Sequence, residues 1–176
     1  MLQNYRIREY NNDDSEDVLH FISDMIVNEF DITLDFDNLD SDLLYIKHHY
    51  KDNGGCFWIV ERIDNYQIIG TVAIRKLEQL VSTTANTIDG DDDVANTAAA
   101  ELKRMFLLKP YRGLGIGQQM LDTALNFAKK SGYSKILLYS SKTLTVSRSL
   151  YLKNGFVDIP RYNDDHRADI FMGKKL

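Results

Sequence analysis

The sequence predicts an α/β fold in which helices cover both faces of one mixed β-sheet. Two observations lead to this prediction. Runs rich in β-branched and aromatic residues alternate with segments whose apolar residues recur every three or four positions. Their order is β-α-α-β-β-β-α-β-α-β-β, and helices interspersed among strands pack on both sides of a sheet. The 176 residues show no linker and no repeat, so residues 1–176 are expected to form a single domain.

The front of the chain is predicted to supply an edge strand and two helices. Residues 5–10 alternate in the way a short strand does. Asp13, followed three residues later by Glu16, resembles a capping pair, and helical spacing of apolar residues continues to about Glu29. A second helix is expected over 39–50, before a glycine-containing breaker.

The next two strands are predicted to form a hairpin. Residues 56–63 and 66–75 are rich in β-branched and aromatic residues and are separated by an Asp-Asn dipeptide. Gly70, inside the second run, is expected to mark a β-bulge. Cys56 is the only cysteine, so it cannot form an internal disulfide and is expected to pack as a small apolar residue.

A polar stretch between Leu77 and Ala98 interrupts the strands. Its aspartates at 89–93 could be taken for a calcium loop, but the regular spacing and the closing glutamate of such a loop are missing. A solvated excursion is the preferred interpretation. The histidines and the cysteine also lack metal-type spacing, so no metal is expected.

The second half of the chain alternates strands and helices. A helix that follows a glycine-rich loop is expected to bury an apolar stripe and to stop at Gly132. The other predicted elements are strands over 101–108, 135–140, 156–159 and 168–174, and a helix over 145–153.

The loop before that helix carries the clearest functional signal. Gly113, Gly115 and Gly117 have no Cβ, so the backbone can approach a ligand closely and turn successive N–H groups toward it. The first turn of the following helix adds unpaired N–H groups at the positive end of its dipole. Arg112 adds a charge beside the loop. These features predict a phosphate-binding loop.

Other interpretations of the loop fit less well. A dinucleotide fingerprint would need glycine at Gln118 and an acidic residue about 20 residues further on, and neither is present. A P-loop would need Gly-Lys-Ser or Gly-Lys-Thr, which is also missing. A tight strand-to-helix turn without a ligand stays open as an alternative.

Composition narrows the classes of partner. Apolar residues make up 44% and charged residues 27%, as in ordinary soluble proteins. There is no apolar run of membrane-spanning length and no signal peptide, so a cytoplasmic location is expected. The net charge of −5 argues against nucleic-acid binding and favours a cationic acceptor.

Several segments together resemble the GNAT superfamily of N-acetyltransferases. The run E-L-K-R-M-F-L-L-K-P-Y-R-G-L-G-I-G at 101–117 is similar to the family's strand and acetyl-CoA pyrophosphate loop. The run S-L-Y-L-K-N-G-F at 149–156 and the closing R-A-D-I-F-M at 167–172 are similar to two further family segments. The resemblance covers nearly the whole chain, and it implies a GNAT-like, mostly antiparallel mixed sheet and acetyl-CoA as co-substrate.

The resemblance also implies positions for the donor. Backbone groups of Phe106 and Leu107 would face the pantetheine arm, unless both residues are simply core. The amides expected to hold the pyrophosphate belong to Arg112, Gly113, Leu114, Gly115, Ile116 and Gly117. At Leu144 this sequence departs from the family, which often has asparagine there, and Ser147 could substitute because it lies one helical turn before Tyr151.

Two residues are candidates for catalysis. Tyr151 matches the family's tyrosine that protonates the leaving thiolate, with a core tyrosine as the alternative. Glu101 stands where some members carry a base for the acceptor amine, with a solvated rim residue as the alternative. The loops 31–37 and 161–167, the second of which includes His166, are candidate specificity elements.

The predicted function is acetyl transfer from acetyl-CoA directly to a primary amine of a small molecule or protein. A non-catalytic acyl-CoA sensor of the same fold is the alternative, and a nicotinamide-dependent oxidoreductase is disfavoured by Gln118. Partners are expected to be acetyl-CoA and an amine, without nucleic acid or membrane. The sequence does not fix the oligomeric state, and a homodimer is one option.

Overall fold

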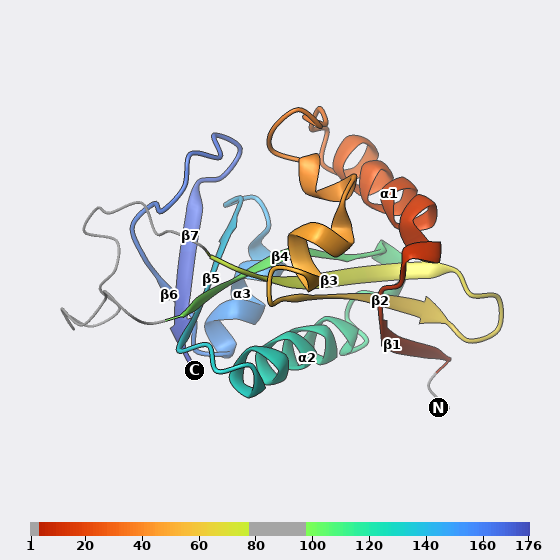
Figure 1. Ribbon diagram of the computed structural model, residues 1–176. Helices are drawn as coiled ribbons and strands as arrows, with labels where there is room; N and C mark the ends of the chain where they lie inside the picture. Colours follow the sequence, from red (N-terminus) through yellow and green to blue (C-terminus); the bar gives the residue numbers. More distant parts are fainter. Residues whose placement is uncertain (1–3, 78–97) are drawn as a thin grey trace.

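A computed structural model describes residues 4–77 and 98–176, which form one seven-stranded sheet flanked by helices (Figure 1). The strand order is β1-β2-β3-β4-β5-β7-β6. Every neighbouring pair is antiparallel except β4 and β5. The strands are β1 (Tyr5–Glu9), β2 (Cys56–Arg62), β3 (Ile68–Lys76), β4 (Ala99–Leu107), β5 (Lys135–Ser140), β6 (Val157–Asp158) and β7 (Ile170–Lys175). The mixed, mostly antiparallel sheet that was predicted is confirmed.

Helices cover both faces of this sheet, as predicted. On one face lie α1 (Ser15–Asp24) and short helical turns within residues 25–51, and on the other face lies α2 (Ile116–Lys130) (Figure 1). The third helix, α3 (Thr145–Lys153), contributes Tyr151 to the core that contains the buried face of α2. Alternate residues of the central strands feed the two cores: Trp58 packs toward α2, whereas its neighbours Phe57 and Ile59 pack toward α1.

The front helices differ in detail from their prediction. The expected pair of Asp13 and Glu16 is wrong as a cap: Asn11 and Asp14 form the capping box of a 3₁₀ turn, Asn12–Asp14, that leads into α1. The helical path then continues as a π-helical turn, Met25–Glu29, and so ends where predicted.

The single helix expected over 39–50 is also wrong. A 3₁₀ turn, Ser41–Leu43, and a π-helical turn, Lys47–Lys51, take its place. The spacing still buries Leu43, Ile46 and Tyr50. The helix is interrupted because the side chains of Asp40 and Asp42, near its start, pair with Arg104 on β4.

The hairpin of β2 and β3 carries the predicted bulge. Val60 pairs with Gly70 and Glu61 with Ile68, which leaves Ile69 as the extra residue. A Cβ at Gly70 would lie 2.9 Å from the carbonyl oxygen of Phe106, so this glycine permits close approach of β4. Cys56 is buried in the core at the start of β2, as expected.

The later elements follow the prediction closely. The strand over 135–140 and the helix over 145–153 are confirmed with the same bounds, and the strands near 157 and 170–175 are shorter or shifted by two residues or fewer at each end. The predicted apolar stripe of α2 is buried. The polar stretch at 78–97, including the candidate calcium loop, lies outside the described residues.

Candidate active site

The cavity of interest opens where β4 and β5 separate. These parallel strands pair only from Ala99 to Glu101 on one side and from Lys135 to Leu137 on the other. Beyond that point a cavity of about 660 Å³ is lined by the rest of both strands, by α3, by the turn that follows α1 and by residues 165–168. Its size is typical of a ligand site, for which about 300–1,000 Å³ is common.

A bulge in β4 shapes one wall of this cavity. Where β4 pairs with β3, Thr71 lies opposite Phe106 and Ala73 lies opposite Lys103. Arg104 and Met105 of β4 therefore face one β3 residue, Val72, which makes a β-bulge. Arg104 has a φ of 51°, in the left-handed region that residues other than glycine rarely adopt. The Thr71 hydroxyl donates to the Arg104 carbonyl at 2.8 Å and so fixes the bulge.

The glycine loop has the backbone that a phosphate site needs. Gly113 and Gly115 have φ values of 76° and 82°, which other residues adopt only with strain. A Cβ at either position would meet no atom within 4 Å, so the space beside the backbone is open. Gly115 is the N-cap residue of α2, and no side chain caps this end of the helix. The N–H groups of the first turn, which begins with Ile116 and Gly117, therefore have no partner within the helix. The loop residues therefore fit a diphosphate.

The rest of the loop connects to the cavity. The Arg112 guanidinium donates to the Leu107 carbonyl at 2.8 Å and pairs with Glu29 at 2.5 Å, and Glu29 lines the cavity. Leu107 itself packs against the core, and Leu114 is exposed. Because Arg112 bridges the loop and the turn after α1, it holds the loop at the edge of the cavity.

Tyr151 lies in the cavity with its hydroxyl nearly free. The residue is 7% exposed, and its hydroxyl contacts only the Met105 sulfur, at 3.8 Å, among the described hydrogen-bond partners. Burial raises the pKa of Tyr151 to about 12, so the phenol stays protonated at neutral pH. Ser147, one helical turn earlier, and Phe106 line the same cavity. The structure therefore brings three of the predicted site residues together.

Glu101 is placed differently. It is 1% exposed, pairs with Arg75 at 2.7 Å and accepts a hydrogen bond from the Tyr162 hydroxyl at 2.8 Å. It lies at the last position of β4 that pairs with β5, and it is not among the described residues that line the cavity. The alternative of a solvated rim residue is wrong, because the carboxylate is buried and its oxygens already have partners.

Five charged residues that line the cavity form what we call the charged wall: Asp40, Lys103, Arg104, Asp165 and Arg167. Asp165 and Arg167 belong to a loop that the sequence marked as a candidate specificity element, whereas Asp40, Lys103 and Arg104 were missed. Asp40 is fully buried and pairs with Arg104 at 3.0 Å and with Arg167 at 2.9 Å. Arg167 also pairs with Asp165 at 3.1 Å. Two adjacent cations in the middle of the predicted 101–108 strand were the signal that could have revealed this wall.

Arg104 is the centre of the charged wall. It also binds Asp42, which accepts a further hydrogen bond from the Tyr50 hydroxyl. Burial acts to raise the pKa of Asp42, but the Arg104 guanidinium outweighs it and holds that pKa well below its usual range. These contacts keep the start of the interrupted 39–50 segment against the sheet.

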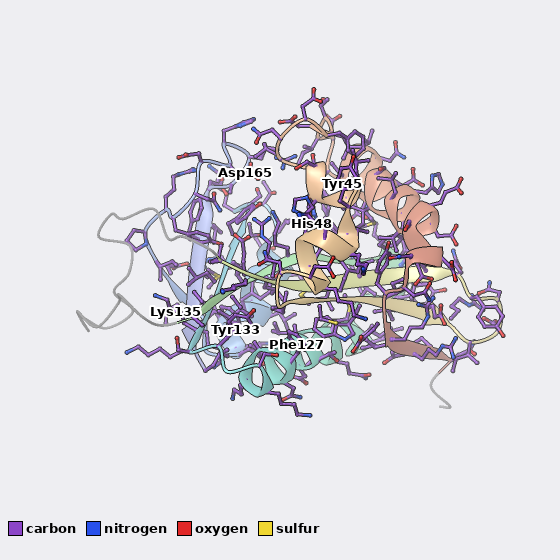
Figure 2. The ribbon with its side chains drawn as sticks, viewed as in Figure 1. Tyr45, His48, Phe127, Tyr133, Lys135 and Asp165 are labelled. Atoms are coloured by element: carbon purple, nitrogen blue, oxygen red, sulfur yellow. The ribbon has the colours of Figure 1, made fainter. Side chains whose placement is uncertain are left out.

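The candidate specificity loops lie on the same side of the molecule as these residues. Figure 2 shows Asp165 on the side of the sheet that carries Tyr45 and His48, opposite Phe127 on α2. Ile32, from the loop after α1, lines the cavity, whereas His166 is exposed. Among the described residues, no group of three or more histidine, cysteine or acidic side chains is arranged to hold a metal. No helix in the described part is long and apolar enough to cross a membrane.

Comparisons with curated proteins find N-acetyltransferases. The chain is 27% identical over 120 residues to N-acetyltransferase family 8 member 3 of Rattus norvegicus, which covers 68% of this chain and 44% of that protein. It is 27% identical over 110 residues to N-acetyltransferase 8B of Homo sapiens, which covers 62% of this chain and 42% of that protein. The matched part is therefore less than half of each of these relatives.

Solved structures share the whole fold. A GNAT-family acetyltransferase from Staphylococcus aureus Mu50 superposes with a TM-score of 0.77 at 27% identity, over 97% of this chain and 98% of that one. A predicted acetyltransferase from Clostridium acetobutylicum, solved with acetyl-CoA, has a TM-score of 0.68 at 25% identity, over 91% of this chain and 94% of that one. The model of the acetyltransferase (GNAT) family matches residues 19–156. This chain belongs to the acetyltransferase (GNAT) family.

Proposed function

We propose that this protein is an N-acetyltransferase that transfers an acetyl group from acetyl-CoA directly to a primary amine. The observation that carries the proposal is the combination of an open glycine loop with a cavity that contains the nearly free hydroxyl of Tyr151. The Clostridium acetobutylicum structure, which has the same fold and holds acetyl-CoA, supports the choice of donor. The acceptor is a small molecule or a protein.

Four groups of this chain would act on the donor. The amides of residues 112–117 would bind the diphosphate of the donor. Beyond their paired segment, the facing edges of β4 and β5 would hold the pantetheine arm along the cavity. The donor supplies an activated acetyl thioester. As the C–N bond to the acceptor forms and the C–S bond breaks, the Tyr151 hydroxyl would give its proton to the sulfur and regain one from the amine. Ser147 would hydrogen-bond the arm in place of the family's asparagine.

Glu101 is a weaker candidate for the base. Its carboxylate is held by Arg75 and Tyr162, so it could act on the amine only through a water molecule or after a rearrangement. Glu101→Gln tests this role: turnover of the variant is compared with that of the wild type under conditions in which both proteins are fully folded.

A thiol-release assay tests the proposed function. The protein is mixed with acetyl-CoA and a panel of amines while free thiol is followed. We expect amine-dependent thiol release. Stabilisation by acetyl-CoA without thiol release across a broad panel would instead indicate an acyl-CoA sensor. A cytoplasmic location, a single domain and the oligomeric state stay predictions, to be checked by fractionation, limited proteolysis and gel filtration.

A further inference from the structure

The carboxylates that line the cavity are already neutralised. Glu29 pairs with Arg112, Asp40 pairs with Arg104 and Arg167, and Asp165 pairs with Arg167. Among the described residues of the cavity wall, no carboxylate is left unpaired. A second positive charge on the acceptor would therefore find no partner in this cavity.

Lys103 is the opposite case. Its side chain is buried, with 9% of the residue exposed, and it lines the cavity. The ammonium donates to the Tyr139 hydroxyl at 2.8 Å and lies 5.1 Å from the centre of that ring. No ion pair to a described carboxylate accompanies this contact. Two of the three ammonium protons are therefore available to a ligand.

The electrostatics agree with this geometry. Burial lowers the pKa of Lys103 to about 8, and the neighbouring Arg75 and Arg104 act in the same direction, whereas Glu101 and Asp42 partly oppose them. A buried ammonium without a counter-ion costs free energy, which a bound anion would recover. Buried cations with such depressed pKa values are common at functional sites.

Lys103 also stands between two hollows. The second has a volume of about 420 Å³ and is lined by Lys103 and Tyr139 together with parts of residues 38–49 and 163–165. Asp42 and Asp165 in its wall are paired with arginines, and Asp164 is exposed at its rim, where solvent weakens its charge. An acceptor that enters through this hollow would meet Lys103 before it reaches the cavity of Tyr151.

We propose that the acceptor is an amine that also carries a carboxylate or a phosphate group, and that Lys103 binds this anionic group. The inference rests on the proposed acetyl transfer and names its substrate class. It replaces the cationic acceptor expected from the net charge of −5, because the local charges of the cavity, and not the total, act on a bound ligand. The lysine would also favour the neutral form of the reacting amine, since like charges disfavour each other.

Matched pairs of amines test this proposal. An amino acid is compared with its carboxamide, and phosphoethanolamine with ethanolamine, by the ratio of kcat/KM in the thiol-release assay. We expect the wild type to favour the anionic member at least tenfold. Lys103→Met should reduce this preference to about twofold or less by raising KM for the anionic amine, and Lys103→Arg should keep most of it. The control is Lys129→Met, at the exposed end of α2.

The outcomes separate this proposal from the proposed function. An equal preference in the wild type and in Lys103→Met, or a wild type that favours the uncharged amine, would overturn the role of Lys103 while the transferase assignment stands. If no amine releases thiol, calorimetry on the CoA complex still decides: amino acid or phosphoethanolamine should bind the wild type and bind Lys103→Met at least tenfold more weakly. Equal or absent binding to both would overturn the role of Lys103.

Discussion

The charged wall lines the cavity, whereas the glycine loop reaches its edge through the pair of Arg112 with Glu29, and the two regions are built in different ways. The loop depends on backbone: left-handed Gly113 and Gly115 and the first turn of α2 lie within a few residues of one another. The charged wall depends on side chains that are distant in sequence, since Arg104 binds Asp40 and Asp42 across more than sixty positions. A locally encoded loop suits the proposed donor site, and a wall assembled from distant segments suits the proposed acceptor site.

The largest effect on ligand binding or turnover is expected at the loop. In Gly115→Glu a carboxylate would occupy the proposed diphosphate site, and we expect the affinity for CoA to fall more than 100-fold in calorimetric titration. The matched control is Gly132→Glu, because Gly132 also has a left-handed φ, 79°, and open space around it, but lies beyond the far end of α2. This control should show the same backbone strain and unchanged CoA affinity. Equal loss of CoA affinity in both variants would refute the proposed diphosphate site in the loop.

The next effect concerns the charged wall and is a loss of stability. Arg104→Met leaves Asp42 and one side of Asp40 buried without their main partner, which costs about 3–5 kcal/mol in the free energy of unfolding. Arg148→Met serves as control, because its pair with Asp158 is exposed and worth less than about 1 kcal/mol. Urea denaturation of both variants checks this, and equal losses would contradict it.

The same variant should change the pH dependence of stability. In the wild type the pKa of Asp42 is depressed, so its contribution is present above the usual carboxyl pKa and is lost as pH falls through the lower folded value. Without Arg104, burial would raise that pKa, and stability would be lost as pH rises through it. Arg104→Met should therefore lose less stability, relative to the wild type, at pH 5 than at pH 7.

The smallest of these effects is kinetic and lies where the two regions meet. Tyr151→Phe removes the proposed proton donor, and we expect kcat to fall about 100-fold with little change in CoA affinity. The matched control is Tyr133→Phe, which is equally buried but donates to the Gly54 carbonyl, away from the cavity. It should lose stability and keep its turnover. If Tyr151→Phe weakens CoA binding more than it slows turnover, the tyrosine is structural.

What the sequence could predict follows from the same contrast. The loop, α2 and α3 were predicted almost residue for residue, because glycine positions and helical periodicity act over short distances. The helix expected over 39–50 was predicted wrongly, because Asp40 and Asp42 pair with Arg104 on a strand that is distant in sequence, and these contacts interrupt the helix. The burial of Glu101 likewise depends on Arg75 and Tyr162, which no local pattern connects to it.

The most direct test of the central claim is a crystal structure of the protein with acetyl-CoA. The account predicts the diphosphate within hydrogen-bond distance of the amides of residues 113–117, and the thioester sulfur beside the Tyr151 hydroxyl in the cavity between β4 and β5. A diphosphate bound elsewhere, or a thioester outside that cavity, would contradict it.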